Sequence, residues 1–100
     1  MFPFKEEILE TSKLYTLVKR EFDNNLTSEE LIWHRDREDR DITLKEGSGW
    51  YIQYDNKLPV LMEKEINYSI PKETWHRIIN KDNTRLVIEV KKYKWILKKF

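Results

Sequence analysis

The chain has 100 residues, of which 39% are hydrophobic and 37% charged, and its formal net charge is +1. A chain of this length forms one domain, residues 1–100, around one modest core, and its composition excludes an intrinsically disordered polypeptide. The near-zero net charge gives no overall field that would attract nucleic acid or an acidic membrane, so we expect neither as a partner.

Cysteine is absent, which excludes a disulfide framework, thiolate catalysis and a cysteine-based zinc site. A chain without cysteine suits a reducing compartment, and no apolar stretch has the length of a signal peptide or a membrane span. We therefore expect a cytoplasmic protein. Alanine is also absent, a bias expected of an AT-rich genome such as that of a phage or a small-genome bacterium.

The first predicted element is a short helix over residues 3–13. Pro3 suits a first helical turn, and Glu6 and Glu7 favour the positive end of a helix. From Leu14 to Glu21 the pattern changes to period two, which indicates a β-strand.

Short strands separated by turns account for most of the remaining chain. The predicted strands are Asp41–Lys45, Trp50–Tyr54, Tyr68–Ile70, Trp75–Asn80 and Arg85–Lys92. The predicted turns lie at 23–25, 47–49, 55–56, Pro59, Pro71 and 81–83. Many short strands with regular turns are typical of an all-β sandwich or barrel.

The two histidines stand in matching tripeptides, Trp33-His34-Arg35 and Trp75-His76-Arg77. Side chains at positions i and i+2 of a strand point the same way, so His34 and Asp36 would project side by side. With His76 they would place two histidines and one carboxylate on one side of a divalent ion, as in non-haem iron sites. The alternative is that each histidine is an ordinary strand residue with a hydrogen-bonded ring.

The spacing around the first tripeptide resembles the first motif of the cupin family. That motif is Gly, five residues, His-x-His, three or four residues, Glu, six residues, Gly. This chain has His34-x-Asp36, three residues, Arg40, six residues and Gly47.

The second tripeptide lies in a stretch that resembles the second cupin motif, which is Gly, five residues, Pro-x-Gly, two residues, His, three residues, Asn. The corresponding positions of this chain, at the same spacing, are Glu65, Pro71, Glu73, His76 and Asn80. The resemblance covers about residues 33–90 and implies an RmlC-like jelly-roll β-barrel, which the short helix would precede.

Two ligand positions of the first motif differ from the family pattern. Asp36 replaces the second histidine and can still bind a metal, but Arg40 replaces the glutamate ligand and cannot. An arginine beside a dication is unfavourable unless carboxylates offset it, and positions 36, 38, 39 and 41 are acidic. Arg40 either holds an anionic ligand or forms an ion pair with Asp36 in an empty site.

The resemblance implies a divalent metal site in the barrel, with Fe, Mn, Zn or Ni held by His34, Asp36 and His76. The expected ligand is a small polar or carboxylated molecule, oriented by Arg40, with Gln53 as a further contact. The alternative is a non-catalytic cupin-fold module that binds a ligand or a protein without metal. The sequence leaves open whether the protein is an enzyme.

A His-x-Asp pair followed by a distant histidine also resembles the 2-oxoglutarate oxygenases, which share the barrel architecture. That family holds the carboxylate of its co-substrate with an arginine beyond the last histidine. Arg85 is placed for this role, whereas Arg77 would face the other way. Chains of that family are normally much longer than this one.

We expect a homodimer, because the strand Leu14–Glu21 is apolar on both faces and small barrels have much surface for their core. The C-terminal Tyr93, Trp95, Leu97 and Phe100 are also hard to bury within one barrel, and cupins often pair through such strands. The alternative is that the N-terminal helix covers these groups. The lysines of the last ten residues are expected to form a solvated edge rather than a nucleic-acid interface.

Overall fold

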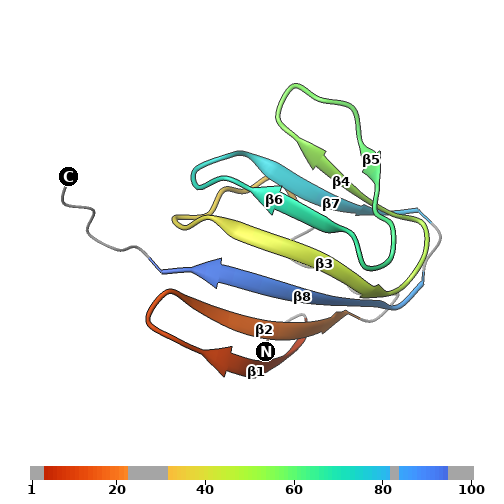
Figure 1. Cartoon of the computed structure of the whole chain (residues 1–100). Helices are drawn as coiled ribbons and strands as arrows, with labels where there is room; N and C mark the ends of the chain where they lie inside the picture. Colours follow the sequence, from red (N-terminus) through yellow and green to blue (C-terminus); the bar gives the residue numbers. More distant parts are fainter. Residues whose placement is uncertain (1–3, 23–31, 82–83, 95–100) are drawn as a thin grey trace.

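The structure is a computed structural model that describes residues 4–22, 32–81 and 84–94. These residues form strands and loops and contain no helix, so none of them forms a helix long and apolar enough to cross a bilayer. The strands are β1 (Lys5–Thr11), β2 (Tyr15–Phe22), β3 (Arg40–Glu46), β4 (Trp50–Tyr54), β5 (Val60–Leu61), β6 (Asn67–Ile70), β7 (His76–Asn80) and β8 (Leu86–Tyr93) (Figure 1). The all-β expectation is confirmed.

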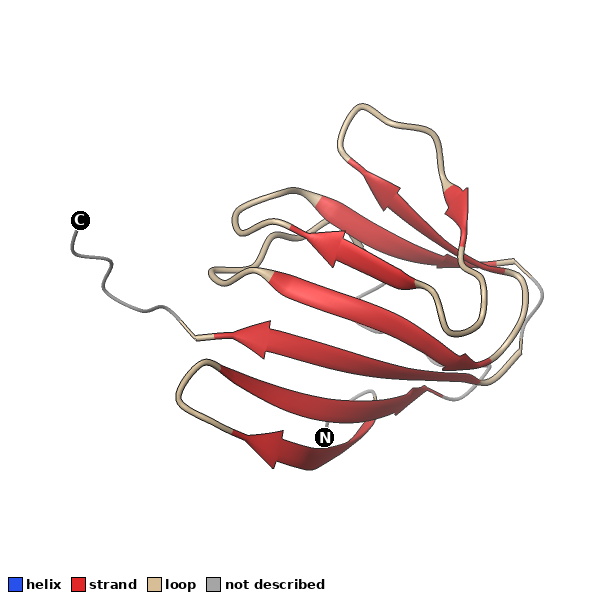
Figure 2. Ribbon diagram, in the orientation of Figure 1, coloured by secondary structure: helices blue, strands red, loops and turns tan. Residues whose placement is uncertain are grey.

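The strands form two antiparallel sheets (Figure 2). The larger sheet has the order β1-β2-β8-β3-β6, and the smaller has the order β5-β4-β7. Because β4 and β7 belong to the smaller sheet while β3, β6 and β8 belong to the larger one, the chain crosses repeatedly between the sheets.

One apolar core joins the sheets. Inward side chains alternate with outward ones along each strand, as in β2, where Val18, Arg20 and Phe22 are buried. Trp50 is the largest fully buried side chain, and its indole N–H donates to the carbonyl (3.2 Å) and the hydroxyl (3.1 Å) of Thr84. The buried cluster consists of Val18, Phe22, Ile42, Leu44, Trp50, Ile52, Met62, Ile70, Ile78, Leu86, Ile88 and Val90.

The predicted helix over residues 3–13 is wrong, because Lys5–Thr11 forms strand β1 and pairs with β2. Ser12 closes this hairpin by accepting hydrogen bonds from the amides of Leu14 and Tyr15, both at 3.1 Å. All seven residues of β1 are exposed, so this segment is held by its backbone pairing rather than by burial of its side chains. Pairing with β2 satisfies the backbone groups and overrides the local helix preference.

The other strand predictions agree with the structure to within one residue at each end. The predicted strand Leu14–Glu21 is β2, and the five later ones are β3, β4, β6, β7 and β8. The two-residue strand β5 was not predicted. The predicted turn at 23–25 and the residues after Lys94 lie outside the described part of the chain.

Three residues at glycine positions of the cupin motifs, Gly47, Glu65 and Glu73, have positive φ values. Gly47 and Gly49 have φ values of +128° and +70°, as expected for the only glycines. Glu65 and Glu73 stand at the two glycine positions of the second motif, and their φ values are +66° and +60°. The chain therefore keeps glycine-like turns at both positions although the side chains are glutamate.

Candidate metal centre

His34 and His76 lie opposite each other in an isolated antiparallel bridge beside β7. The His34 amide donates to the His76 carbonyl at 3.0 Å, and the His76 amide donates to the His34 carbonyl at 2.9 Å. Residues paired in this way direct their side chains to the same face. The two ring centroids are therefore only 4.2 Å apart. His34 was expected to lie in a strand, but its strand-like pairing is limited to this one bridge with His76.

The rest of each Trp-His-Arg tripeptide secures the bridge from the outside. The Arg77 guanidinium lies over the Trp33 ring, 4.9 Å from its centroid, and the Arg35 guanidinium lies 5.3 Å from the centroid of Trp75. These reciprocal cation–π contacts join the segment around His34 to β7. The repeated tripeptide was the sequence signal for this antiparallel pairing.

Both imidazole rings are fixed by the same kind of hydrogen bond. Nδ1 of His34 is 2.9 Å from the Ile32 carbonyl oxygen, and Nδ1 of His76 is 2.8 Å from the Thr74 carbonyl oxygen. A carbonyl oxygen can only accept, so Nδ1 carries the proton in each ring. In the neutral ring the lone pair is then on Nε2, which is the arrangement of a metal-binding histidine with a backbone partner.

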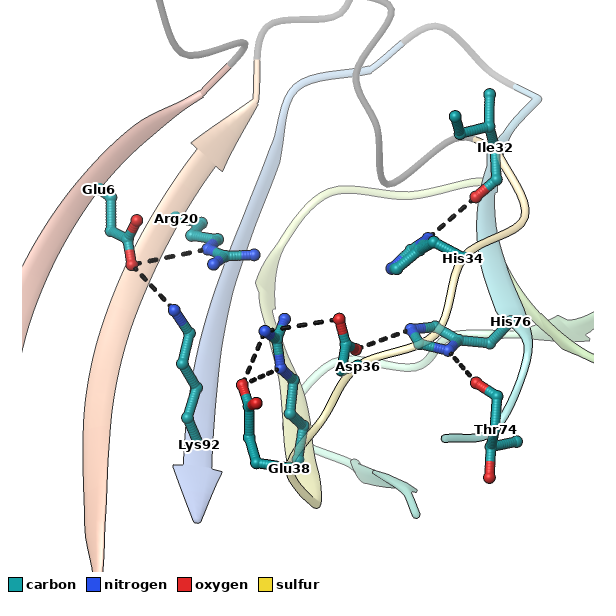
Figure 3. A network of polar contacts seen from close by, with 10 residues as sticks. Glu6, Arg20, Ile32, His34, Asp36, Glu38, Thr74, His76 and Lys92 are labelled. Carbon is teal, nitrogen blue, oxygen red and sulfur yellow. Dashed lines mark hydrogen bonds and ion pairs between the residues drawn. The ribbon is translucent and has the colours of Figure 1, made fainter. Parts of the chain in front are cut away.

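Asp36 completes the group (Figure 3). Its Oδ2 lies 3.4 Å from Nε2 of His76, and its backbone carbonyl accepts a 2.7 Å hydrogen bond from the amide of Glu73. The Oδ2 atom is buried and accepts no hydrogen bond from the residues that the structure describes. One ligand atom from each of His34, Asp36 and His76 can be chosen so that all three lie within 4.8 Å of one another.

This donor set fits a divalent transition metal. A charge-assisted hydrogen bond between Asp36 and His76 would measure about 2.7–2.9 Å, shorter than the observed 3.4 Å. Two atoms bound to one ion at about 2.1 Å and at a tetrahedral angle are about 3.4 Å apart. Two imidazole nitrogens and one carboxylate oxygen suit Fe, Mn, Zn and Ni.

Arg40 lies at the start of β3 and forms ion pairs with both neighbouring carboxylates. Its Nε and Nη2 donate to Oε1 of Glu38 at 3.0 and 2.8 Å, and its Nη2 is 3.4 Å from Oδ1 of Asp36. Glu38 thus balances the arginine charge, while Asp36 keeps Oδ2 towards His76. Asp39 and Asp41 do not contribute, because they accept hydrogen bonds from the Lys72 amide and the Tyr93 hydroxyl.

Gln53 lies away from the candidate metal group of His34, Asp36 and His76. It pairs in register with Arg77, whose Nε donates to the Gln53 side-chain oxygen at 2.8 Å. The amide nitrogen of Gln53 donates to the Lys57 carbonyl at 2.9 Å. Because its neighbours Ile52 and Tyr54 face the core, Gln53 lies on the outer face of the small sheet.

Arg85 is also remote from the group. Its side chain is half-exposed and forms ion pairs with Glu21 and Glu46. The carboxylate-binding role suggested by the resemblance to 2-oxoglutarate oxygenases is therefore wrong for Arg85.

Tyr54 forms part of the wall beside the group, since it pairs in register with His76 on β4 and β7. Its hydroxyl donates to the Ser69 carbonyl at 2.7 Å. Burial, and to a smaller extent Tyr68, raises the pKa of the Tyr54 phenol above its ordinary value. The phenol therefore remains a neutral donor over the physiological pH range.

No family model and no curated protein matches this sequence. Solved structures do match. An RmlC-like cupin from Shewanella frigidimarina superposes with a TM-score of 0.73 at 16% identity, over 93% of this chain and 78% of that one. A cupin domain from Bordetella pertussis superposes with a TM-score of 0.71 at 14% identity, over 94% and 96% of the two chains.

The fold is that of the cupins. An RmlC-like cupin family protein with a double-stranded β-helix fold, from Methanocaldococcus jannaschii, gives a TM-score of 0.71 at 13% identity over 90% of this chain and 79% of that one. Likeness at such low identity establishes the jelly-roll fold and confirms that part of the family resemblance. Each of these structures comes from a cellular organism, so they do not support a phage origin.

Proposed function

We propose that this protein is a metal-binding cupin in which His34, Asp36 and His76 hold one divalent ion for a small polar or carboxylated ligand. The observation that carries the proposal is the 3.4 Å approach of Asp36 Oδ2 to His76 Nε2, in a ring whose Nδ1 is committed to a carbonyl. Both atoms present lone pairs, so a cation between them would relieve their repulsion.

In this proposal each chain residue has a separate role. The two backbone-anchored rings and Asp36 hold the ion, and Arg40 orients an anionic group of the ligand from beside Asp36. When bound, the ion would act as a Lewis acid or bind oxygen, as metals in such donor sets can. Whether a reaction follows depends on the ligand, because cupin folds support many chemistries.

The alternative is a binding module without metal. The Arg40–Asp36 contact favours it, because a guanidinium 3.4 Å from the carboxylate could replace the positive charge of an ion. In that case a proton on His76 would complete an ion pair with Asp36.

Metal titration of tag-free protein distinguishes the two functions. The metal-dependent function predicts one bound ion per chain, lost in His34→Ala and in His76→Ala. Lys81→Gln, at the exposed residue that follows the opposite end of β7 and lies over the Tyr51 ring, is the matched control and should retain the ion. Wild-type protein that takes up far less than one ion after reconstitution would rule out the metal-dependent function.

Substitutions of Arg40 distinguish the two roles proposed for this residue. If it orients the ligand, Arg40→Ala should weaken ligand binding and leave the ion in place. If it closes a metal-free site, Arg40→Glu should create metal affinity where the wild type has none.

We also propose that the protein forms a homodimer in the cytoplasm. In the described structure β1 covers one edge of β2, yet β1 is itself an exposed edge strand that carries Ile8 and the nearby Leu14, 66% and 56% exposed. Pairing of this strand with a second copy would cover both residues. Light scattering tests this, and a mass of one chain that is unchanged by concentration would refute it.

A further inference from the structure

A pocket lies on the outer face of the small sheet, on the side away from the candidate metal group. Its volume is about 340 Å³, and the described residues that line it are Trp33, Asp55 and Trp75. This volume is in the range of small-molecule sites. Because the His34–His76 bridge turns both imidazoles inward, the tryptophan before each histidine faces outward. The pocket is therefore separate from the metal group, although its tryptophans adjoin two of the proposed ligands.

The two tryptophans expose much of their apolar surface in one place. Trp33 is 39% exposed and Trp75 is 43% exposed. Tryptophan is on average a highly buried residue, and single exposed apolar side chains need no explanation. Two of them around one pocket are instead expected of a surface that binds something.

The neighbouring arginines fix the orientation of both rings. The Arg77 guanidinium lies 4.9 Å from the Trp33 ring centroid, and the Arg35 guanidinium lies 5.3 Å from that of Trp75. Arg77 also donates through Nε to the Gln53 side-chain oxygen. Neither arginine is among the described residues that line the pocket. The rings are thus positioned before a ligand arrives, which lowers the cost of binding.

Asp55 brings the one charge among the described lining residues. Its backbone amide donates to the Trp75 carbonyl at 2.9 Å, which holds the residue beside that ring. Within the described part of the chain its carboxylate forms no ion pair and accepts no hydrogen bond. A free carboxylate next to aromatic rings repels an anion and attracts a cation, and the rings attract a cation that has apolar surface.

We propose that this pocket binds a small organic cation, such as a substituted ammonium group, against the rings of Trp33 and Trp75 and beside the Asp55 carboxylate. The indole rings attract the positive charge and cover the alkyl groups that surround it. The carboxylate then balances the charge. The pocket uses no residue of the candidate metal group and does not require a metal.

The test is binding of choline to metal-free protein, measured by calorimetry and by tryptophan fluorescence. The matched probe is 3,3-dimethyl-1-butanol, which has the shape of choline without the charge. Choline should saturate one site per chain, and the neutral probe should bind more weakly. Asp55→Asn should weaken choline binding by about threefold to fivefold, the loss expected for a solvent-exposed charge pair. This variant keeps the backbone hydrogen bond to Trp75, so the protein should still fold.

Trp75→Leu should weaken choline binding by a similar factor, because one of the two rings is removed. The matched control is Tyr51→Leu. Tyr51 is also an outward-facing aromatic residue of the small sheet, with the Lys81 ammonium 4.8 Å from its ring centroid, but it is not among the residues that line the pocket. This variant should bind choline as the wild type does.

Three results would overturn the inference. They are a failure of choline to saturate a site, equally tight binding of the neutral probe, and an unchanged affinity in Asp55→Asn. Because the titration uses metal-free protein, failure here leaves the proposed metal function untouched, and failure of the metal titration leaves this pocket untouched.

Discussion

The space between the two sheets has an apolar end and a polar end, built on opposite ends of the same strands. On β3 the apolar end is Leu44 and the polar end is Arg40, and their register partners on β8 are Ile88 and Lys92. The small sheet repeats the pattern. Trp50 begins β4 at the apolar end, and Tyr54, at the other end of β4, pairs with His76 at the polar end. The apolar end supplies burial energy, whereas the polar end places charges where they oppose folding.

This difference separates residues that stabilise the fold from residues that the proposed function would use. At the apolar end the side chains are 0–1% exposed and could be replaced only with loss of packing. At the polar end Asp36 lies 3.4 Å from both Arg40 and His76, while Arg40 also donates to Glu38 at 3.0 and 2.8 Å. The proposed metal and ligand function would account for charges kept at this end of the fold.

The largest expected effect is a difference between the two ends in how much a substitution lowers the free energy of unfolding. Trp50→Ala should lower the free energy of unfolding by about 3–5 kcal/mol, because it leaves a cavity in the core. Lys92→Met, at the polar end, should cost less than about 1 kcal/mol, since it removes the charge opposite Arg40 and keeps the volume. Urea unfolding measures both, and equal losses would contradict the division into two ends.

The next effect is stabilisation by metal. At a zinc concentration about 100 times its Kd, the wild type should gain about 2.7 kcal/mol in the free energy of unfolding. Asp36→Asn should lose this gain, since an amide is a poor ligand for the ion. Asp39→Asn should keep it, because Asp39 is bonded to the Lys72 amide instead. A gain that is the same in Asp36→Asn would show that zinc binds elsewhere.

The smallest effect concerns two left-handed turn residues, Glu73 beside Asp36 at the polar end and Glu65 beside Leu44 at the apolar end. Glu73→Gly should stabilise the protein by up to about 1 kcal/mol, because relief of the left-handed backbone exceeds the chain entropy that glycine loses. Glu65→Gly should gain less, since it also removes the ion pair with Lys45. Thermal unfolding measures both changes. Destabilisation by Glu73→Gly would mean that its side chain has a role beyond the turn.

The apolar end could be predicted from the sequence because period-two alternation is a local property. Residues 50–54 and 76–80 alternate, and the structure places their strands to within one residue of the prediction. The N-terminal segment could not be predicted in the same way. Its strand exists because β2 offers an unpaired edge, a tertiary fact that competes with the helix preference of Pro3, Glu6 and Glu7.

The candidate metal group was accessible to sequence analysis because motif spacing encodes it, even though His34 lies outside a regular strand. The outward orientation of Gln53 follows from the same alternation, because Ile52 and Tyr54 on either side of it face the core, and the predicted ligand contact was inconsistent with that pattern. The contact between Arg20 and Glu6 was not predicted either, because it depends on β1 pairing with β2, and the predicted helix removed that pairing.

The most direct test of the metal account is the anomalous scattering from crystals grown with zinc. The account predicts one strong peak, bonded to Nε2 of His34, Nε2 of His76 and a carboxylate oxygen of Asp36, with both Nδ1 atoms still hydrogen-bonded to the carbonyls of Ile32 and Thr74. A zinc-saturated crystal with no peak there, or with zinc bound through Nδ1, would contradict it.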